Sequence, residues 1–387
     1  MKKGWQTKRL GDVCEVIMGQ SPDGESYNTK GEGVPLINGP VEFSDESFGE
    51  TIRSKFTTQP TKFCKKDDLI LCVRGSTTGR MNIAGFDACV GRGVAAIRAK
   101  QYQPWVNHFI SSKRDEIHGK GTGATFPNVS GAMLADFELV IPPLAEQQRI
   151  VGLLDEAFTG LATAKANAEK NHQNARALFE SHLQSVFTQR GKGWVEKTIG
   201  ECCILRSGTT LPKEIERPSG EIPYLKVADM NIKENLNGVT CSSRYINKND
   251  VNASNLLPVG TTIFPKRGGA ILTNKKRLTK RTICADLNIM GVTPKTGLLP
   301  EFLFNFFLRL DLREINNGSS IPQINNYSVE PLLIAFPNSI TEQKAIVTRL
   351  TSLSAETQRL ATLYERKLAA LEALKKSLLH RAFSGGL

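Results

Sequence analysis

The residues best suited to nucleophilic catalysis or metal binding are eight cysteines and five histidines, and their spacing supports neither role. No two cysteines are separated by two residues, and no histidine lies at zinc-ligand spacing from a cysteine. Zinc sites and disulfide frameworks both depend on such spacing. The pattern therefore argues against a metal site and favours reduced thiols, which are typical of the cytoplasm.

Three short stretches resemble catalytic motifs without completing them. "GSTTGR" (75–80) lacks the four residues between glycines, and the following Lys-Ser/Thr, of a phosphate-binding loop. "IPPL" (141–144) lacks the polar first residue and aromatic last residue of an amino-methyltransferase motif, and "PD" (22–23) is not followed by a nuclease Glu-x-Lys. An enzyme is the least favoured function, and the sequence indicates a binding protein.

The charge of the chain points to a polyanionic partner. The formal net charge is +12, and the excess is local rather than uniform. Residues 251–285 contain seven Lys or Arg and no acid, and residues 88–114 contain five and no acid. Basic stretches of this kind are typical of nucleic-acid interfaces, although a solvated basic surface gives the same composition.

An internal repeat organises the whole chain of 387 residues. "GWQTKRLGDVCEVIMG" from Gly4 returns as "GWVEKTIGECCILRSG" from Gly193, and "LILCVRGS" (69–76) returns as "TIFPKRGG" (262–269). "TFPNVS" (125–130) answers "SIPQIN" (320–325), and "AEQQRIV" (145–151) answers "TEQKAIV" (341–347). Two copies at a period near 195 residues indicate a duplicated domain rather than a solenoid.

Each copy ends in a stretch that predicts a long helix, 145–190 and 341–387. Both follow a proline-marked break and have apolar residues at alternating steps of three and four, which is the pattern of a heptad seam. At 1.5 Å per residue each helix reaches roughly 65 Å, too long to pack on one small domain. We therefore expect an antiparallel coiled coil, the alternative being that each helix lies separately on a globular domain. The expected seam is Ile150, Leu154, Phe158, Leu161, Ala164, Ala168, Ala175, Leu178 and Val186, with Ile346, Leu350, Leu353, Leu360, Leu363, Tyr364, Leu368, Leu371, Leu374 and Leu378.

The globular parts, 1–144 and 191–340, are predicted to be mixed α/β. Short apolar runs broken by Gly, Asn and Pro are typical of strands. Such runs are "DLILCV", "GVAAIRA" and "FELVIP" in the first part, and "TTIFP", "LNIMGVTP" and "PLLIAFP" in the second. Two segments, 104–119 and 300–318, have helical periodicity, and Gly318 is the expected cap of the second helix. The fold class is therefore α+β, with two repeated domains and two long helices.

With these repeats in view, the sequence resembles the specificity subunit of type I DNA restriction-modification enzymes. The resemblance covers essentially the whole length, and "PPLAEQQRIVGLLD" (142–155) is its most specific stretch. It implies a first target recognition domain at 1–144, a central spacer helix at 145–190, a second recognition domain at 191–340 and a C-terminal spacer helix at 341–387. The second copy, "PNSITEQKAIV", departs from the double-proline form at this boundary.

The resemblance also implies the partners. In this family each recognition domain binds half of a split sequence in double-stranded DNA, and the helices bind two modification subunits. Those subunits carry S-adenosylmethionine and methylate adenine, and restriction subunits join to cut DNA. The chain itself is then expected to be non-catalytic, cytoplasmic and without a cofactor of its own. Alternatives are the specificity subunit of a type IIB-like enzyme and a non-enzymatic adapter that binds RNA or protein.

The candidate DNA-binding residues lie in four polar loops, two in each domain. Basic side chains neutralise phosphates, while Arg, Lys, Asn, Gln, Ser and Thr can hydrogen-bond base edges. For any single residue, a solvated surface charge or a turn position is an equally good interpretation. The candidates are Arg74, Thr77, Arg80, Lys120, Thr122 and Asn128 in the first domain, and Lys266, Arg267, Lys275, Lys276, Arg277, Gln323 and Asn325 in the second.

Overall fold

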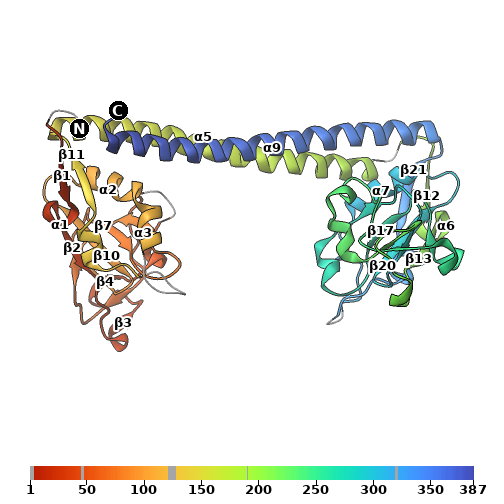
Figure 1. The fold of residues 1–387 in the computed structure, drawn as a ribbon, viewed down its shortest axis with the longest axis horizontal. Coiled ribbons are helices and arrows are strands. Elements are labelled where there is room, and N and C mark those ends of the chain that lie inside the picture. Colours follow the sequence, from red (N-terminus) through yellow and green to blue (C-terminus); the bar gives the residue numbers. More distant parts are fainter. Residues whose placement is uncertain (1–3, 45–47, 121–127, 190, 319–320) are drawn as a thin grey trace. The chain divides into compact units, whose positions relative to one another are not determined.

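The computed structural model describes residues 4–44, 48–120, 128–189, 191–318 and 321–387. The chain divides into two compact units: unit 1 comprises Met1–Glu169 and Arg366–Leu387, and unit 2 comprises Lys170–Glu365. Each unit contains one globular α/β domain and part of each of the two long helices, α5 (Leu144–Thr188) and α9 (Ile340–Ser384) (Figure 1). The α+β class and the two long helices expected from the sequence are therefore confirmed.

The domain of unit 1 contains three sheets. Their strand orders are β1-β11, β2-β10-β7-β8 and β3-β5-β4-β9-β6, and the β4–β9 pair is parallel. Strand β7 is apolar along its length and all four residues are buried, as in a strand covered on both faces. The elements are β1 (Gln6–Arg9), α1 (Leu10–Val13), β2 (Cys14–Met18), β3 (Tyr27–Asn28), β4 (Val34–Ile37), β5 (Phe56–Thr57), β6 (Phe63–Cys64), β7 (Leu69–Cys72), β8 (Met81–Ile83), β9 (Ala88–Val90), β10 (Val94–Ala99), α2 (Gln103–Ser112), α3 (Arg114–Lys120), α4 (Gly131–Ala135) and β11 (Glu138–Ile141).

The domain of unit 2 repeats this topology, except that its third sheet has four strands and lacks a counterpart of β3 among the described residues. Its sheets are β12-β21, β13-β20-β17-β18 and β15-β14-β19-β16, and β14–β19 is again the parallel pair. The elements are β12 (Trp194–Thr198), α6 (Ile199–Cys202), β13 (Cys203–Ser207), β14 (Ile222–Leu225), β15 (Tyr245–Ile246), β16 (Leu256–Leu257), β17 (Thr262–Pro265), β18 (Arg277–Leu278), β19 (Ile283–Ala285), β20 (Ile289–Pro294), α7 (Pro300–Arg309), α8 (Asn326–Val329) and β21 (Leu333–Pro337).

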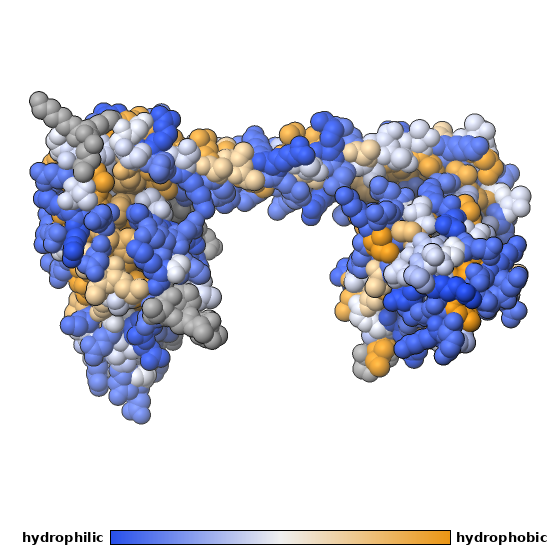
Figure 2. All heavy atoms as spheres, viewed as in Figure 1, coloured by the Kyte–Doolittle hydropathy of each residue, from blue (hydrophilic) through white to orange (hydrophobic). Residues whose placement is uncertain are grey.

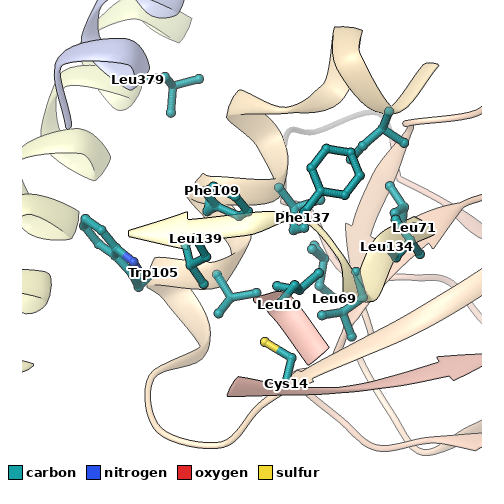
Figure 3. Close-up of a cluster of buried hydrophobic side chains, with 14 of the residues drawn as sticks. Leu10, Cys14, Leu69, Leu71, Trp105, Phe109, Leu134, Phe137, Leu139 and Leu379 are labelled. Atoms are coloured by element: carbon teal, nitrogen blue, oxygen red, sulfur yellow. The ribbon is translucent and has the colours of Figure 1, made fainter. Parts of the chain in front are cut away.

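Each core joins a domain to the ends of both long helices. In unit 1, Leu379 of α9 belongs to the same buried cluster as Trp105 and Phe109 of α2 (Figure 3). The ring of Phe383 lies 4.7 Å from that of Trp105, measured between centroids. In unit 2, Phe187 of α5 packs edge-on against Phe302, at 5.2 Å. Buried aromatic pairs of this kind stabilise a junction beyond the area they bury.

The repeated Glu-Gln motif fixes the start of each long helix. Gln147 is buried, and its Nε2 donates a hydrogen bond to the carbonyl of Pro142 at 2.8 Å. Its counterpart Gln343 donates to the carbonyl of Pro337 at 2.8 Å, and its Oε1 accepts from the backbone N–H of Leu299 at 2.8 Å. A buried side-chain amide is costly unless it is hydrogen-bonded, and both glutamines are bonded to the proline carbonyl just before their helix. The motif thus has the same structural role at the start of α5 and of α9.

The two long helices pair antiparallel within each unit. In unit 1, Lys165 of α5 forms an ion pair with Glu372 of α9 at 3.2 Å, and Phe158 lies under the ammonium of Lys375. Residue numbers therefore rise along α5 as they fall along α9. In unit 2, His172 of α5 lies 3.2 Å from Glu365 of α9. The helices thus pack on each other as well as on the domains.

The seam differs in part from the one expected. Small side chains are buried where the helices pair, namely Ala168 in unit 1, and Ala175, Thr357 and Ala361 in unit 2. Three leucines assigned to the seam are instead about half exposed: Leu178 at 52%, Leu363 at 50% and Leu374 at 48%. Small residues let the backbones approach closely, so the larger leucines lie outside the contact.

One expected helix is shorter than its periodicity indicated. Helix α7 ends at Arg309, because Leu310 is extended with ψ 139°, and the cap at Gly318 is wrong. Leu312 is fully buried, and its N–H donates to Oδ1 of Asn274 at 2.9 Å. This tertiary contact outweighs the helical preference of residues 310–317. No helix in the described residues is long and apolar enough to cross a membrane.

Candidate nucleic-acid interface

The structure joins the two candidate loops of each domain through an equivalent pair of residues. Arg74 forms an antiparallel bridge with Asn128 in unit 1, and Arg267 forms one with Gln323 in unit 2. The glycine after each arginine has positive φ, 81° at Gly75 and 67° at Gly268, so each loop turns sharply there. Side chains far apart in the sequence therefore lie together at one place in each domain.

These bridges belong to a larger surface made by strand ends, which we call the strand-end surface. In unit 1 the carboxyl ends of β2, β4, β7 and β9 and the start of β10 lie together at this edge. Backbone bonds connect them: Gly19 N–H to Val94 O at 3.0 Å, Gln20 N–H to Val90 O at 2.9 Å, Gly91 N–H to Ile37 O at 2.9 Å, Val73 N–H to Gly93 O at 3.0 Å and Val129 N–H to Val73 O at 2.9 Å.

Unit 2 has the same five backbone bonds at equivalent positions. They run from Gly208 N–H to Ile289 O at 2.9 Å, Thr209 N–H to Ala285 O at 2.8 Å, Asp286 N–H to Leu225 O at 2.9 Å, Lys266 N–H to Asn288 O at 2.8 Å and Ile324 N–H to Lys266 O at 2.9 Å. The two domains thus present one backbone arrangement with different side chains. That is what two readers of different sequences require.

Several candidate residues lie on or beside this surface and are accessible. Arg74, Asn128 and Arg267 are exposed. Gln323 and Asn325 are half-buried, with Nδ2 of Asn325 donating to Oη of Tyr327 at 3.0 Å. Lys266 is half-buried too: its Nζ donates to Oγ of Ser207 at 2.7 Å, and burial, followed by the charge of Arg267, lowers the Lys266 pKa.

Three further candidates of unit 1 lie away from the bridge. Thr77 and Arg80 belong to the turn into β8, where the N–H of Arg80 donates to the carbonyl of Thr77 at 2.9 Å. The guanidinium of Arg80 lies 6.0 Å from the ring centroid of Phe43. Lys120, on α3, forms an ion pair with Glu116 at 2.8 Å. Thr122 lies outside the described residues.

The basic run 275–277 is tied into the fold more than the sequence indicated. Lys276 is only 3% exposed, and its Nζ donates to Oδ1 of Asn274 at 2.7 Å and to the carbonyl of Leu310 at 2.5 Å. Burial lowers the pKa of Lys276 to about 8, opposed by Asp311 and assisted by Arg313. A buried ammonium cannot contact a phosphate, so Lys276 is wrong as a DNA-binding candidate.

Lys275 and Arg277, on either side of Lys276, are also hydrogen-bonded within the fold. Nε of Arg277 donates to the carbonyl of Met230 at 3.2 Å, and the ammonium of Lys275 donates to Oδ1 of Asn231 at 2.5 Å. Both side chains are half-buried. They remain candidates for contact at the edge of the surface, but part of their role is to hold the loop.

Sequence reasoning missed several residues on or near this surface. Gln20 and Arg92 of unit 1 are exposed there, and only the acid-free stretch 88–114 pointed towards Arg92. In unit 2, three large apolar side chains near the bridge are exposed, although the visible surface is mostly hydrophilic (Figure 2). These are Leu272 at 59%, Ile321 at 60% and Tyr327 at 67%.

The described residues contain no group of three or more His, Cys, Asp or Glu side chains that could hold a metal ion. The eight cysteines are free, and seven of them are buried. Burial raises the pKa of Cys64 and Cys14 to about 12, so these thiols are poor nucleophiles. The side chains of the strand-end surface carry arginine, amide and hydroxyl groups, which can hydrogen-bond a ligand.

Comparison with known proteins places both halves of the chain in one family. The sequence model described as "Type I restriction modification DNA specificity domain" matches residues 2–170 and 191–367. The putative type I restriction enzyme MjaX specificity subunit of Methanocaldococcus jannaschii is 32% identical over 177 residues, which is 44% of this chain and 40% of that protein. The EcoKI specificity subunit of Escherichia coli is 22% identical over all of this chain and 90% of its own length.

Solved structures share the fold over the whole chain. A chain from work on complex assembly and conformational transition of the type I R-M system matches with a TM-score of 0.81 at 17% identity, covering 100% of this chain and 99% of its own. The HsdS subunit from Thermoanaerobacter tengcongensis matches with a TM-score of 0.64 at 17% identity, covering 100% and 98%. At this identity the likeness concerns the fold.

Proposed function

This chain belongs to the type I restriction-modification DNA specificity family, and on that premise we propose how it works. It reads a two-part DNA target as the specificity subunit of a type I complex. Residues 1–144 bind one half-site and residues 191–340 bind the other, while α5 and α9 set the number of unspecified base pairs between them. The observation that carries this proposal is the strand-end surface, built on the same five backbone bonds in both domains but with different side chains.

The chemistry of that surface suits duplex DNA. Arg74 and Arg267 are exposed at equivalent positions, where each can neutralise a phosphate or pair with a guanine. Asn128 and Gln323, directly opposite them, carry the amide groups that pair with adenine. The exposed apolar groups of unit 2, Ile321 and Tyr327, suit a thymine methyl group. Different side chains on one scaffold give the two domains different base preferences.

The long helices are the proposed docking surface for two modification subunits. Five of their leucines are exposed: Leu144 at 39%, Leu153 at 45% and Leu374 at 48% in unit 1, and Leu178 at 52% and Leu363 at 50% in unit 2. Exposed leucines on a paired helix are typical of surfaces that another protein covers. Leu178 and Leu374 occupy equivalent positions of the repeat, one in each unit, so the duplication provides two similar docking surfaces, one for each modification subunit.

Catalysis is assigned to the partners. The modification subunits would bind S-adenosylmethionine and methylate adenine, and restriction subunits would join them to cut DNA. The chain has no cofactor or catalytic centre of its own in this proposal, and it acts in the cytoplasm, where its free cysteines stay reduced.

Methylation-sensitive sequencing tests the proposal. Cells that carry the modification subunit gene are compared with and without the gene for this chain. We expect methylated adenines in one bipartite motif only when both genes are present. Purified chain alone should transfer no methyl group. An unchanged methylome in cells where the two proteins co-purify, or methyl transfer by the chain alone, would contradict the proposal.

A further inference from the structure

One turn, between β9 and β10 in unit 1 and between β19 and β20 in unit 2, presents a different residue in each domain. In unit 1 the turn is Gly91-Arg92-Gly93, closed by a bond from the N–H of Val94 to the carbonyl of Gly91 at 3.1 Å. In unit 2 it is Asp286-Leu287-Asn288, closed by a bond from the N–H of Ile289 to the carbonyl of Asp286 at 2.9 Å. With the other backbone bonds also shared, Arg92 and Leu287 occupy the same position on the strand-end surface.

The backbone under Arg92 is tightly packed. A Cβ atom at Gly91 would lie 2.0 Å from Oδ1 of Asn38, and one at Gly93 would lie 2.4 Å from the carbonyl oxygen of Asn38. The N–H of Arg92 donates to Oγ of Ser21 at 3.3 Å. The position of Gly93 therefore requires glycine, because the clash there is with backbone, and the turn holds the arginine at a fixed place beside the end of β4. A fixed backbone is what precise recognition needs.

The side chain of Arg92 is available to a ligand. It is exposed, it lies in the acid-free stretch 88–114, and no carboxylate pairs with it among the residues that the structure describes. Arg98, in the same stretch, contrasts with it, because its guanidinium is bound to Asp68 at 2.7 Å and to Glu15 at 2.9 Å. Arg98 joins strands, whereas Arg92 leaves its five N–H donors unused within the fold.

The comparison between domains separates two tasks. Arg74 and Arg267 are identical at equivalent positions, so they suit a task common to both half-sites, such as phosphate contact. Arg92 has a leucine as its counterpart, and Leu287 cannot hydrogen-bond a base. Next to Leu287, the carboxylate of Asp286 accepts from Nδ2 of Asn288 at 2.6 Å, so this turn offers no cation. This turn can therefore give the two domains different base preferences.

We infer that Arg92 determines specificity in the first half-site by pairing with a guanine in the major groove. A guanidinium fits O6 and N7 of guanine with two parallel hydrogen bonds, and this is the commonest specific contact between protein and DNA. The second domain, with Leu287 there, does not read guanine at the equivalent place. This inference rests on the proposed function and names the base that one residue reads.

The test uses the complex of the full chain with its modification subunits and three variants: Arg92→Ala, Arg92→Lys and, as the matched control, Leu287→Ala. Methylome sequencing defines the target, and binding is then measured on duplexes with each guanine of the first half-site replaced by 7-deazaguanine, which lacks the N7 acceptor. For the wild type, one replacement should weaken binding measurably, by less than the roughly 5- to 150-fold expected for loss of a whole bidentate pair, because O6 of the guanine remains. For Arg92→Ala the same replacement should have no effect, and for Arg92→Lys, whose ammonium can still donate to guanine, the effect should be smaller than for the wild type.

The methylated motif should show the same loss of discrimination as the binding measurements. Arg92→Ala should accept other bases at that single position and Arg92→Lys should accept them to a smaller extent, while Leu287→Ala leaves the first half-site intact. If Arg92→Ala weakens all sequences alike and Arg92→Lys restores binding, the residue contacts a phosphate and the inference is wrong. An unaltered first half-site in both Arg92 variants also overturns it. If the inference about Arg92 fails in either way but the wild-type complex still methylates a bipartite motif, the proposed function is unaffected. If the wild-type complex methylates no such motif, the proposed function itself is contradicted.

Discussion

Replacing Lys276 by methionine tests whether this lysine is part of the fold. Between its folded pKa of about 8 and the ordinary lysine value of 10.5, the unfolded chain binds more protons than the folded chain. Stability linked to this group is therefore fully present above pH 10.5 and is lost as the pH falls through 8. From pH 7 to pH 9 the gain for the wild type is about 1 kcal/mol. The Lys276→Met variant should lack this rise.

Urea unfolding at pH 7, 8 and 9 measures the effect, and the difference between wild type and variant at each pH cancels the other titrating groups. Lys275→Met is the matched control, because the ammonium of Lys275 donates to the exposed side chain of Asn231. The dependence of its stability on pH should parallel that of the wild type. Lys276→Met should also leave the salt dependence of DNA binding by the complex unchanged. Parallel pH profiles for Lys276→Met and the wild type, or a salt slope lower by about 0.9, would refute the structural role.

Three further predictions concern the surface and the helices. Arg74→Ala and Arg267→Ala should each weaken DNA binding at all sequences and lower the salt slope by about 0.9, as salt titration would show; a loss confined to one base pair would contradict a shared phosphate task. Gly93→Ala should lower the melting temperature because its Cβ would lie 2.4 Å from the backbone carbonyl oxygen of Asn38, whereas Gly152→Ala, with nothing within 4 Å on α5, should stabilise by about 1 kcal/mol; equal melting temperatures would contradict the packing of the turn. Adding four residues to both α5 and α9 at facing positions inserts about 5.4 Å, which should lengthen the unspecified gap by one or two base pairs in the methylome, and an unchanged gap in a folded complex would exclude the helices as the spacer.

Much of the fold could be predicted from the sequence because the pattern of each main element occurs in both copies of the repeat. Strands β7 and β17 occur where apolar runs recur in both copies, and buried Gln147 and Gln343 explain why the Glu-Gln motif returns. Periodicity was less informative where tertiary contacts decide. Helix α7 stops at Arg309 because Leu312 is drawn into the core, and leucines such as Leu374 lie outside the seam because alanines allow closer packing.

The sequence indicated which loops form the candidate site, but not which of their residues are accessible to DNA. The bridge between Arg74 and Asn128 joins positions more than fifty residues apart, and only the fold brings them together. Lys276 was indistinguishable from Lys275 in sequence, because burial depends on the position of Leu310 and Asn274 rather than on residue type. Arg92 lies in a short turn with no motif; the acid-free stretch 88–114 includes it, but the comparison of the two domains is needed to single it out.

The most direct test of the account is a domain exchange read by methylome sequencing. Residues 1–144 are replaced by the equivalent domain of a relative that recognises a different sequence, and the chimera is expressed with its modification subunit. The account predicts that one half of the methylated motif changes to that of the relative, while the other half and the gap stay the same. If both halves change together, or if neither changes in a complex that still methylates DNA, the two domains are not independent readers and the central claim fails.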